Sequence, residues 1–192
     1  MGLLRRYKSE IYGRYRKAYL RDGVYTGVFL SVVVLFMKLI YYPIAVPHTL
    51  YTDLALLVAT FFFGYRYRQR LPEGKVFFKE LMLYGLGLGV VAAVVYGLFL
   101  MLYGSVIDAD FPHRCLEQFV NNERNGAGTP EEKEQTIAVM QTYTVVTWAL
   151  IGAFLTAVMS IMTAFVMALV LRTENNIVRP QKCFFARKIR EK

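Results

Sequence analysis

The apolar residues of this chain gather in blocks, separated by polar segments that carry most of the charges. Four blocks approach the roughly 20 residues that a helix needs to cross a hydrocarbon layer about 30 Å thick. The second block is the shortest of the four. The pattern predicts an all-α polytopic membrane protein with four transmembrane helices, at residues 24–46, 50–65, 81–104 and 145–171.

The polar segment at residues 105–144 predicts a small helical hairpin outside the membrane, between the third and fourth spans. The sequence NGAG interrupts it. Thr129 is placed as the N-cap of the second hairpin helix, with Pro130 at its first position and Glu132 completing a capping box. Because no helix breaker follows before Leu171, we expect this second helix to run on into the fourth span.

The two ends of the chain are predicted to be basic tails, residues 1–23 and 172–192, on either side of a membrane domain at residues 24–171. In the first tail, apolar and aromatic residues recur every fourth position, which favours an amphipathic helix. Such a helix would lie in the headgroup layer or continue into the first span, and the alternative is a disordered basic tail. The recurring residues are Leu3, Tyr7, Ile11, Tyr15 and Tyr19.

The charge distribution predicts the orientation. Seven Lys or Arg residues precede the first block, five lie between the second and third blocks, and seven follow the fourth, but the long loop has three against seven acids. By the positive-inside rule, both termini lie in the cytoplasm. The chain is also 56% hydrophobic, which is too apolar for a soluble protein of this length.

The net charge of +9 comes from basic clusters next to the predicted spans. The partners closest to such clusters are anionic lipid headgroups, so we expect lipid contact and no nucleic-acid binding. The basic residues expected to face lipid are Arg5, Arg6, Arg14, Arg16, Lys17, Arg66, Arg68 and Arg70.

The stretch YGLGLGVVAAVVYG in the third block fits two patterns. One is the glycine fingerprint of a dinucleotide-binding turn, which must follow a strand and open a helix. Because these glycines lie inside a span-length block, we favour the other, a helix face of small residues that lets a second helix approach closely. The third and fourth spans are expected to pack together along two such faces, and the rival interpretation is a homodimer contact. The predicted packing residues are Gly85, Gly89, Ala93, Gly97, Gly152, Thr156, Ser160 and Ala164.

Lys38 and Asp53 are the charged residues inside the predicted spans. If the first two spans form a hairpin, the two residues are equally far from its turn and therefore at the same depth. We favour an intramembrane ion pair between them. Two alternatives remain: each side chain extends separately to the outer headgroups, or the pair belongs to a proton or ion relay.

The sequence contains little that indicates catalysis. It has no serine-hydrolase motif, no HExxH and no phosphate-binding loop. His48 and His113 lie on the predicted outer side but lack the fixed spacing of a zinc site. Cys115 and Cys183 are predicted on opposite sides of the membrane and cannot pair. We therefore expect no enzyme activity, no cofactor and no metal.

Several segments occur in an order that resembles a known family. FFFGYRYRQRLPEGKVFFKELMLYGLGLG is followed by Tyr96, then by DADFP and GAGTPEE, and finally by a glycine- and alanine-rich block that ends at Arg172. Over roughly residues 24–172, this order resembles the small four-span bacterial inner-membrane proteins of the domain of unknown function 4199 family. The resemblance implies an inner-membrane location and carries over no activity. The long tails depart from the family's pattern.

These observations favour a non-catalytic integral membrane scaffold or accessory subunit that acts through helix–helix and lipid contacts. Its partners would be anionic membrane lipids and either another membrane protein or further copies of itself. The alternative function is a small oligomeric transporter or channel that uses the region of Lys38 and Asp53.

Overall fold

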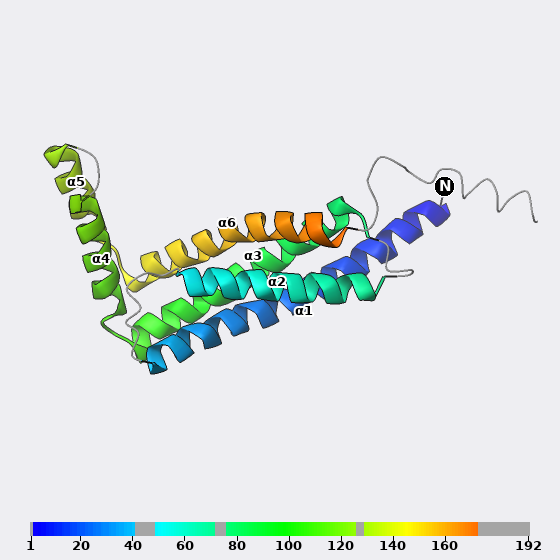
Figure 1. The fold of residues 1–192 in the computed structure, drawn as a ribbon, viewed down its shortest axis with the longest axis horizontal. Helices are drawn as coiled ribbons and strands as arrows, with labels where there is room; N and C mark the ends of the chain where they lie inside the picture. The colour runs from blue at the N-terminus through cyan, green and yellow to red at the C-terminus, as the bar shows by residue number, and fades with distance from the viewer. Residues whose placement is uncertain (1, 41–48, 72–75, 126–128, 173–192) are drawn as a thin grey trace, which may run out of the picture.

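A computed structural model gives the fold of the chain (Figure 1). It describes residues 2–40, 49–71, 76–125 and 129–172, and for residues 2–16 it describes the backbone alone. These residues form an all-α structure, as predicted. The helices are α1 (Gly2–Leu39), α2 (Leu50–Gln69), α3 (Phe78–Leu102), α4 (Phe111–Asn125), α5 (Pro130–Met140) and α6 (Val145–Leu171), and a π-helical turn, η2 (Tyr103–Ile107), extends α3.

Four helices, α1, α2, α3 and α6, lie side by side in an elongated bundle (Figure 1). Helix α3 is central, because its most extensive contacts are with α6 on one side and with α1 on another. Helices α4 and α5 form a hairpin across one end of the bundle, which we call the hairpin end. The opposite end, where Asp22, Arg70 and Leu171 lie, is called the basic end.

Among the described residues, three helical segments are long and apolar enough to cross a membrane: Lys17–Leu39, Phe78–Ile107 and Val145–Leu171. The prediction of four spans is therefore supported for three of them. Helix α2 is not in this set, because Asp53 near its start and two arginines near its end reduce its mean hydropathy. It nevertheless lies alongside the other three helices in the bundle (Figure 1).

The first span differs from its predicted bounds. Helix α1 runs without interruption from Gly2 to Leu39, so the amphipathic tail continues directly into the span. This agrees with one of the alternatives considered, and no proline interrupts the segment. The candidate span in the structure is Lys17–Leu39, against the predicted 24–46, and residues 41–46 of the prediction lie outside the described residues.

The hairpin differs from the prediction at its second connection. Helix α5 ends at Met140 and α6 begins at Val145, so the expected continuous helix is absent. The intervening sequence QTYT is rich in threonine, and the Thr142 hydroxyl donates to the Val139 carbonyl oxygen at 2.7 Å. Side-chain bonds of this kind compete with the helical hydrogen bonds of the backbone. The fourth span has its predicted bounds.

The capping box at the start of α5 is present as predicted. The Thr129 backbone N–H donates to Glu132 Oε2 at 3.0 Å, and the Glu132 N–H donates to Thr129 Oγ1 at 3.4 Å. Pro130 is the first residue of the helix. The hydrogen bond from the Thr129 backbone N–H, followed by that with the Thr129 side chain, lowers the pKa of the Glu132 carboxyl. Helix α4 ends at Asn125, where the predicted break begins.

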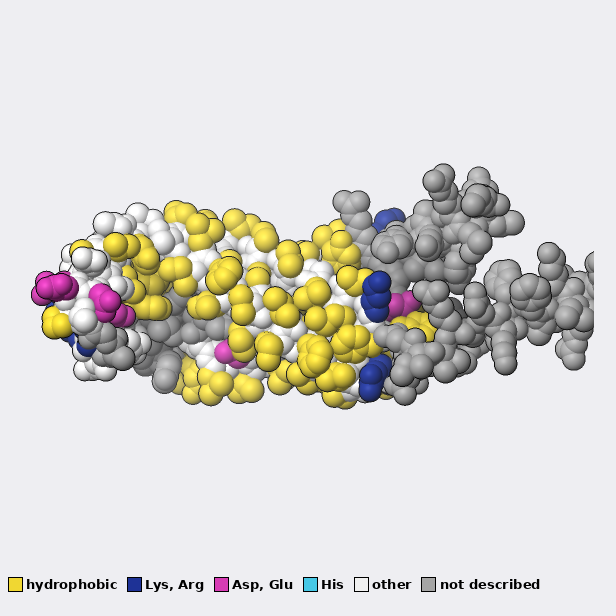
Figure 2. Space-filling view, turned by 90° about the horizontal axis from the view of Figure 1, so that it is seen from above, with side chains coloured by type: hydrophobic (Ala, Val, Ile, Leu, Met, Phe, Trp, Pro, Cys, Tyr) yellow, Lys and Arg dark blue, Asp and Glu magenta, His cyan; other side chains and the backbone are white. Residues whose placement is uncertain are grey.

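Large hydrophobic side chains cover the outer surface of the bundle between its two ends (Figure 2). Acidic side chains appear at the hairpin end, and Lys and Arg side chains appear where the hydrophobic surface meets the basic end. Each of the four long helices contributes to the hydrophobic surface. Examples are Val28, Phe36, Val58, Phe62, Val94, Leu98, Phe154 and Met162, which are all exposed.

Candidate functional site

A buried carboxylate lies at the basic end of the bundle. The side chain of Asp22, on α1, is 1% exposed, and the Tyr84 hydroxyl on α3 donates to its Oδ2 atom at 2.7 Å. Arg21 donates to Oδ1 from both Nε and Nη2 at 3.0 Å. Arg70, the C-cap of α2, has its Nη1 atom 3.7 Å from Oδ2. We call this group the Asp22 cluster, and it joins α1, α2 and α3.

Packing around the Asp22 cluster holds its members in position. The ring of Tyr84 stacks on Tyr67 of α2, with 4.3 Å between centroids. The Thr26 hydroxyl donates to the Asp22 carbonyl oxygen at 2.9 Å. Sequence reasoning missed this cluster. The available signal was an acid adjacent to a span in a strongly basic segment.

A second cluster lies at the hairpin end, around Asp108. Its Oδ2 atom accepts hydrogen bonds from the Tyr103 hydroxyl at 2.8 Å and from Arg114 Nη2 at 2.6 Å. Lys38 Nζ lies 3.3 Å from the same oxygen and donates to the Ile107 carbonyl oxygen at 2.7 Å. This Asp108 cluster joins the end of α1, the end of η2 and the start of α4.

The environment of Asp108 holds its carboxyl in the ionised form. Partial burial alone raises the pKa, but hydrogen bonds from Arg114 and Tyr103, the charge of Arg114, and the contact with Lys38 outweigh it. The net result is a pKa below the usual value for aspartate. The cluster is therefore an ionic contact between the bundle and the hairpin at neutral pH.

Lys38 has a different partner from the one predicted. Its ion pair is with Asp108, on the loop after η2, instead of Asp53. The physical reason is that η2 carries the third helix to Ile107, which brings Asp108 level with the end of α1. Asp53 lies in the first turn of α2, where the helix dipole favours a negative charge, and it makes an interaction of its own.

The two predicted faces of small residues meet in the structure. A Cβ atom added at Gly85 would lie 2.7 Å from Ala164 Cβ, and one added at Gly89 would overlap the Ser160 side chain. At Gly97 it would lie 2.8 Å from Ala153 Cβ. Helices α3 and α6 therefore approach too closely at these points for larger side chains. Ala93, Gly152 and Thr156 are also buried.

A further close contact, which sequence reasoning missed, joins α1 to α3. An added Cβ at Gly23 would lie 2.7 Å from Val91 Cβ, and one at Gly27 would lie 2.6 Å from Val95 Cβ. Gly23, Gly27 and Ser31 have the same spacing of four as the predicted faces. The signal was present, but the predicted span began at Val24 and left out the first glycine.

The predicted lipid-facing basic residues have different environments. Lys17 and Arg66 are exposed, Arg68 is partly buried, and Arg70 contacts Asp22. The side chains of Arg5, Arg6, Arg14 and Arg16 lie outside the described residues.

The hairpin is attached to the bundle by a buried apolar contact as well as by the Asp108 cluster. Phe111 and Cys115 of α4 are 0% exposed, and the Phe119 ring lies 5.1 Å from the Trp148 ring of α6. Burial raises the pKa of the Cys115 thiol to about 12, so the thiol is protonated and unreactive at neutral pH. The hairpin therefore has a fixed position at this end of the bundle.

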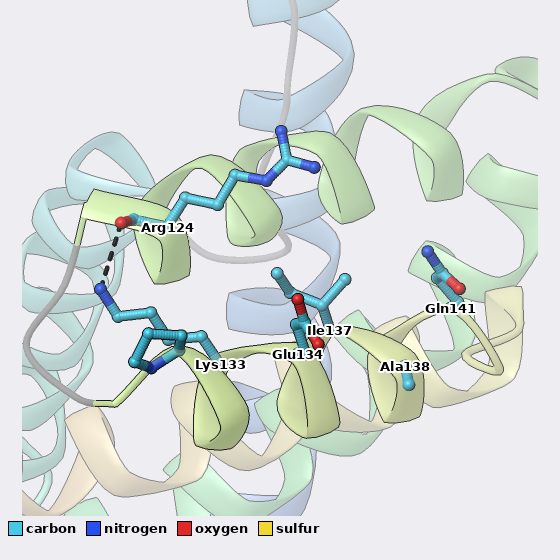
Figure 3. Close-up of a pocket in the computed structure, with 7 residues that line it drawn as sticks. Arg124, Lys133, Glu134, Ile137, Ala138 and Gln141 are labelled. Carbon is cyan, nitrogen blue, oxygen red and sulfur yellow. Dashed lines mark hydrogen bonds between the residues drawn. The ribbon is translucent and has the colours of Figure 1, made fainter.

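A hollow of about 360 Å³ lies between α4 and α5 (Figure 3). Arg124 reaches over it from α4, and Lys133 of α5 donates to the Arg124 carbonyl oxygen at 3.2 Å. Its other side chains come from α5 and the residue after it. They include Glu134, Ile137, Ala138 and Gln141.

Of the two histidines considered as metal ligands, the described residues include His113 alone. Within the described part of the chain, no three side chains of the metal-ligating types come together. His113 is exposed on α4, with Nδ1 3.3 Å from Glu117 Oε1, and His48 lies outside the described residues.

Comparisons with known proteins support one assignment. No curated protein and no solved structure matches the chain. A family model described as a protein of unknown function, DUF4199, matches residues 21–173. That match covers the bundle, both aspartate clusters and the hairpin, and leaves out most of each tail. The chain therefore belongs to the DUF4199 family.

Proposed function

We propose that this protein is a non-catalytic scaffold or accessory subunit of the bacterial inner membrane, with four spans and both termini in the cytoplasm. The exposed side of α2 supports its assignment as the second of these spans, since Leu54, Val58 and Phe62 recur every fourth residue there. A helix with a continuous apolar outer stripe, packed beside three membrane-spanning helices, is stable in the same hydrocarbon layer. The hairpin then lies outside the cytoplasm.

The observation that carries this proposal is the fixed attachment of the hairpin to the bundle. Buried Phe111 and Cys115 and the ionic contacts of Asp108 hold α4 at the membrane surface. An element held in this way presents a constant surface to a partner and loses little conformational freedom on binding. The hollow between α4 and α5 is part of that surface.

The close contacts within the bundle change the surface on which we expect a partner protein to bind. The faces around Gly89 and Ser160 already contact each other, so they are not free to bind the spans of another protein. The outer surface instead has large side chains such as Val94 and Phe154, which suit contact with lipid. The partner protein, or a second copy of this chain, is therefore expected at the hairpin.

The filled interior favours a scaffold over a transporter. Tyr84, Tyr96 and Trp148 are at most 1% exposed and occupy the space between the helices at successive levels. Lys38, which the transporter alternative would use, is engaged by Asp108 and by a backbone carbonyl. A transport path would then have to form between copies of the chain.

Photo-cross-linking in intact cells tests the proposal. A photoreactive residue at Ala138, in the hollow, should cross-link to another membrane protein or a second copy. The same residue at Leu98, on the outer surface of α3, should cross-link to lipid alone. Protein cross-links to a second copy from Leu98, with none from Ala138, would contradict the scaffold and favour an oligomeric transporter.

A further inference from the structure

The two arginines of the Asp22 cluster are much more exposed to solvent than the carboxylate that they contact. The side chain of Asp22 is 1% exposed, but those of Arg21 and Arg70 are 51% and 37% exposed. The carboxylate therefore lies behind the two guanidinium groups, which face outward. Both groups contact the same carboxylate, Arg21 at Oδ1 and Arg70 at Oδ2.

Most of the hydrogen-bonding capacity of these arginines remains unused by Asp22. A guanidinium group carries five N–H donors. Arg21 uses Nε and Nη2 on Oδ1, and Arg70 is paired through Nη1 alone, at 3.7 Å. Two positive charges against one negative charge leave a net positive charge at the opening. Asp22 thus positions two forked donors for an anion, at a site whose own charge is incompletely neutralised.

The surroundings indicate which anion fits. Arg21 lies within the membrane-spanning segment Lys17–Leu39, near its first residue, and the neighbouring side chains Leu20 and Val24 are exposed. An anion bound here has apolar surface beside it along α1. In Figure 2, the Lys and Arg side chains at this end border directly on the hydrophobic surface. A molecule with a phosphate group and acyl chains matches both parts of this surface.

We propose that Arg21 and Arg70 bind the phosphate of an anionic phospholipid, with Asp22 as the positioning residue. The assignment to the cytoplasmic leaflet rests on the proposed function, because it uses the same topology. Phosphate accepts hydrogen bonds from two guanidinium forks in the geometry that arginine favours. A zwitterionic phospholipid binds less well, because its cationic headgroup would lie next to a site of net positive charge.

The test uses the purified full-length protein in a mild non-ionic detergent. Its thermal unfolding is followed during separate titrations with short-chain phosphatidylglycerol, phosphatidylcholine of the same chain length, and inorganic phosphate. A ligand that binds the folded protein raises the unfolding temperature with concentration, which gives its dissociation constant. We expect binding to be strongest for phosphatidylglycerol, clearly weaker for phosphatidylcholine and weakest for inorganic phosphate.

Matched variants distinguish binding of the lipid at a specific site from general electrostatic attraction to a basic surface. Arg21→Gln and Arg70→Gln should each weaken phosphatidylglycerol binding about tenfold, as expected for the loss of one charge-assisted hydrogen bond. The controls Lys17→Gln and Arg66→Gln remove exposed charges that do not contact Asp22, and should leave affinity nearly unchanged. Arg70→Lys keeps the charge but loses the fork, so it should bind with intermediate affinity. Dissociation constants are compared, so a lower unfolding temperature in a variant does not obscure the result.

Three results would overturn the proposal. Equal losses in the control variants would indicate general electrostatic attraction. Equal affinity for phosphatidylcholine would exclude selection for an anionic lipid, and equal affinity for inorganic phosphate would assign the site to a soluble phosphate. The scaffold proposal is tested separately, because failure of the Ala138 cross-link would leave these dissociation constants unchanged.

Discussion

At each end of the bundle, an aspartate accepts a hydrogen bond from a tyrosine hydroxyl of the third helix and lies against two basic side chains. The hydroxyl of Tyr84 lies 2.7 Å from Asp22 Oδ2, and that of Tyr103 lies 2.8 Å from Asp108 Oδ2. The two clusters are therefore built alike, except that Asp22 lies against two arginines and Asp108 against one arginine and one lysine. They differ in what they connect, since Asp22 joins three long helices and Asp108 joins the bundle to the hairpin.

The two clusters also differ in their access to water. The Asp22 side chain is 1% exposed and that of Asp108 is 12% exposed. The penalty for losing one partner is larger where water cannot replace it. From this comparison we expect the Asp22 cluster to contribute more to the stability of the bundle, and the Asp108 cluster more to the placement of the hairpin.

The largest loss of stability is expected from a substitution in the middle of the bundle, at Gly89. Gly89→Leu would force α3 away from Ser160, and overpacking of this kind should lower the free energy of unfolding by about 3 kcal/mol. Thermal unfolding in detergent measures the loss. Val90→Leu adds volume at the next residue, which is 58% exposed, and should have little effect. Similar losses in both variants would mean that the α3–α6 contact tolerates expansion.

The next prediction compares the two tyrosines directly. Tyr84→Phe removes a hydrogen bond to a buried carboxylate and should cost about 2 kcal/mol. Tyr103→Phe removes the equivalent bond to Asp108, where water can substitute, and should cost about 1 kcal/mol. Both rings are 0% exposed, so the two substitutions are matched in burial. A larger cost for Tyr103→Phe, measured by the same unfolding assay, would reverse the ranking of the two ends.

A smaller effect is expected from acidification at the hairpin end. The pKa of Asp108 is lower in the folded protein than in the unfolded chain, so its ionic contacts stabilise the folded state fully above the unfolded value of about 4. That contribution is lost as the pH falls below this value and through the folded pKa. Protection from amide hydrogen exchange, corrected for the pH dependence of the intrinsic rate, should therefore fall first in α4 at low pH. Asp108→Asn should already exchange faster at neutral pH, with less change on acidification; an unchanged acid response would exclude Asp108 as its source.

The substitutions expected to change stability least are those used for cysteine labelling. The labelling tests on which side of the membrane each end of the bundle lies. With Cys183→Ser as the background, Cys115 can stay, because its buried and protonated thiol should not react. Asn121→Cys and Gln69→Cys place thiols at exposed positions on α4 and at the end of α2. An impermeant maleimide should label intact cells at the first position and spare the second. The opposite pattern would invert the proposed orientation.

The elements that depend on local sequence could be predicted. The fourth span, the Thr129 capping box and the contact faces of α3 and α6 follow from the position and spacing of particular residue types. The end of α5 was missed because its threonines act through their own hydrogen bonds, which a search for glycine and proline does not detect. The mean hydropathy of the second span alone does not identify it as membrane-spanning, because the charge of Asp53 lowers that value.

The two aspartate clusters could not be predicted in the same way. An ion pair between helices depends on their relative shift along the bundle, and one residue of shift moves a side chain by about 1.5 Å. The partner of Lys38 was inferred from depth in a two-helix hairpin, but the carboxylate that it contacts follows the third helix. The role of Asp22 needed the positions of α2 and α3 as well, because both of its long-range partners lie there.

The unbroken course of α1 has a mechanical consequence. Its 38 residues correspond to a rod of about 57 Å, and the N-terminal part of that rod extends past the bundle (Figure 1). The close contacts of Gly23 and Gly27 with α3 hold this rod against the bundle, and buried Leu30 and Val34 continue the contact toward Lys38. Because α1 is continuous between its two parts, a protein bound to the first turns would be rigidly coupled to the bundle.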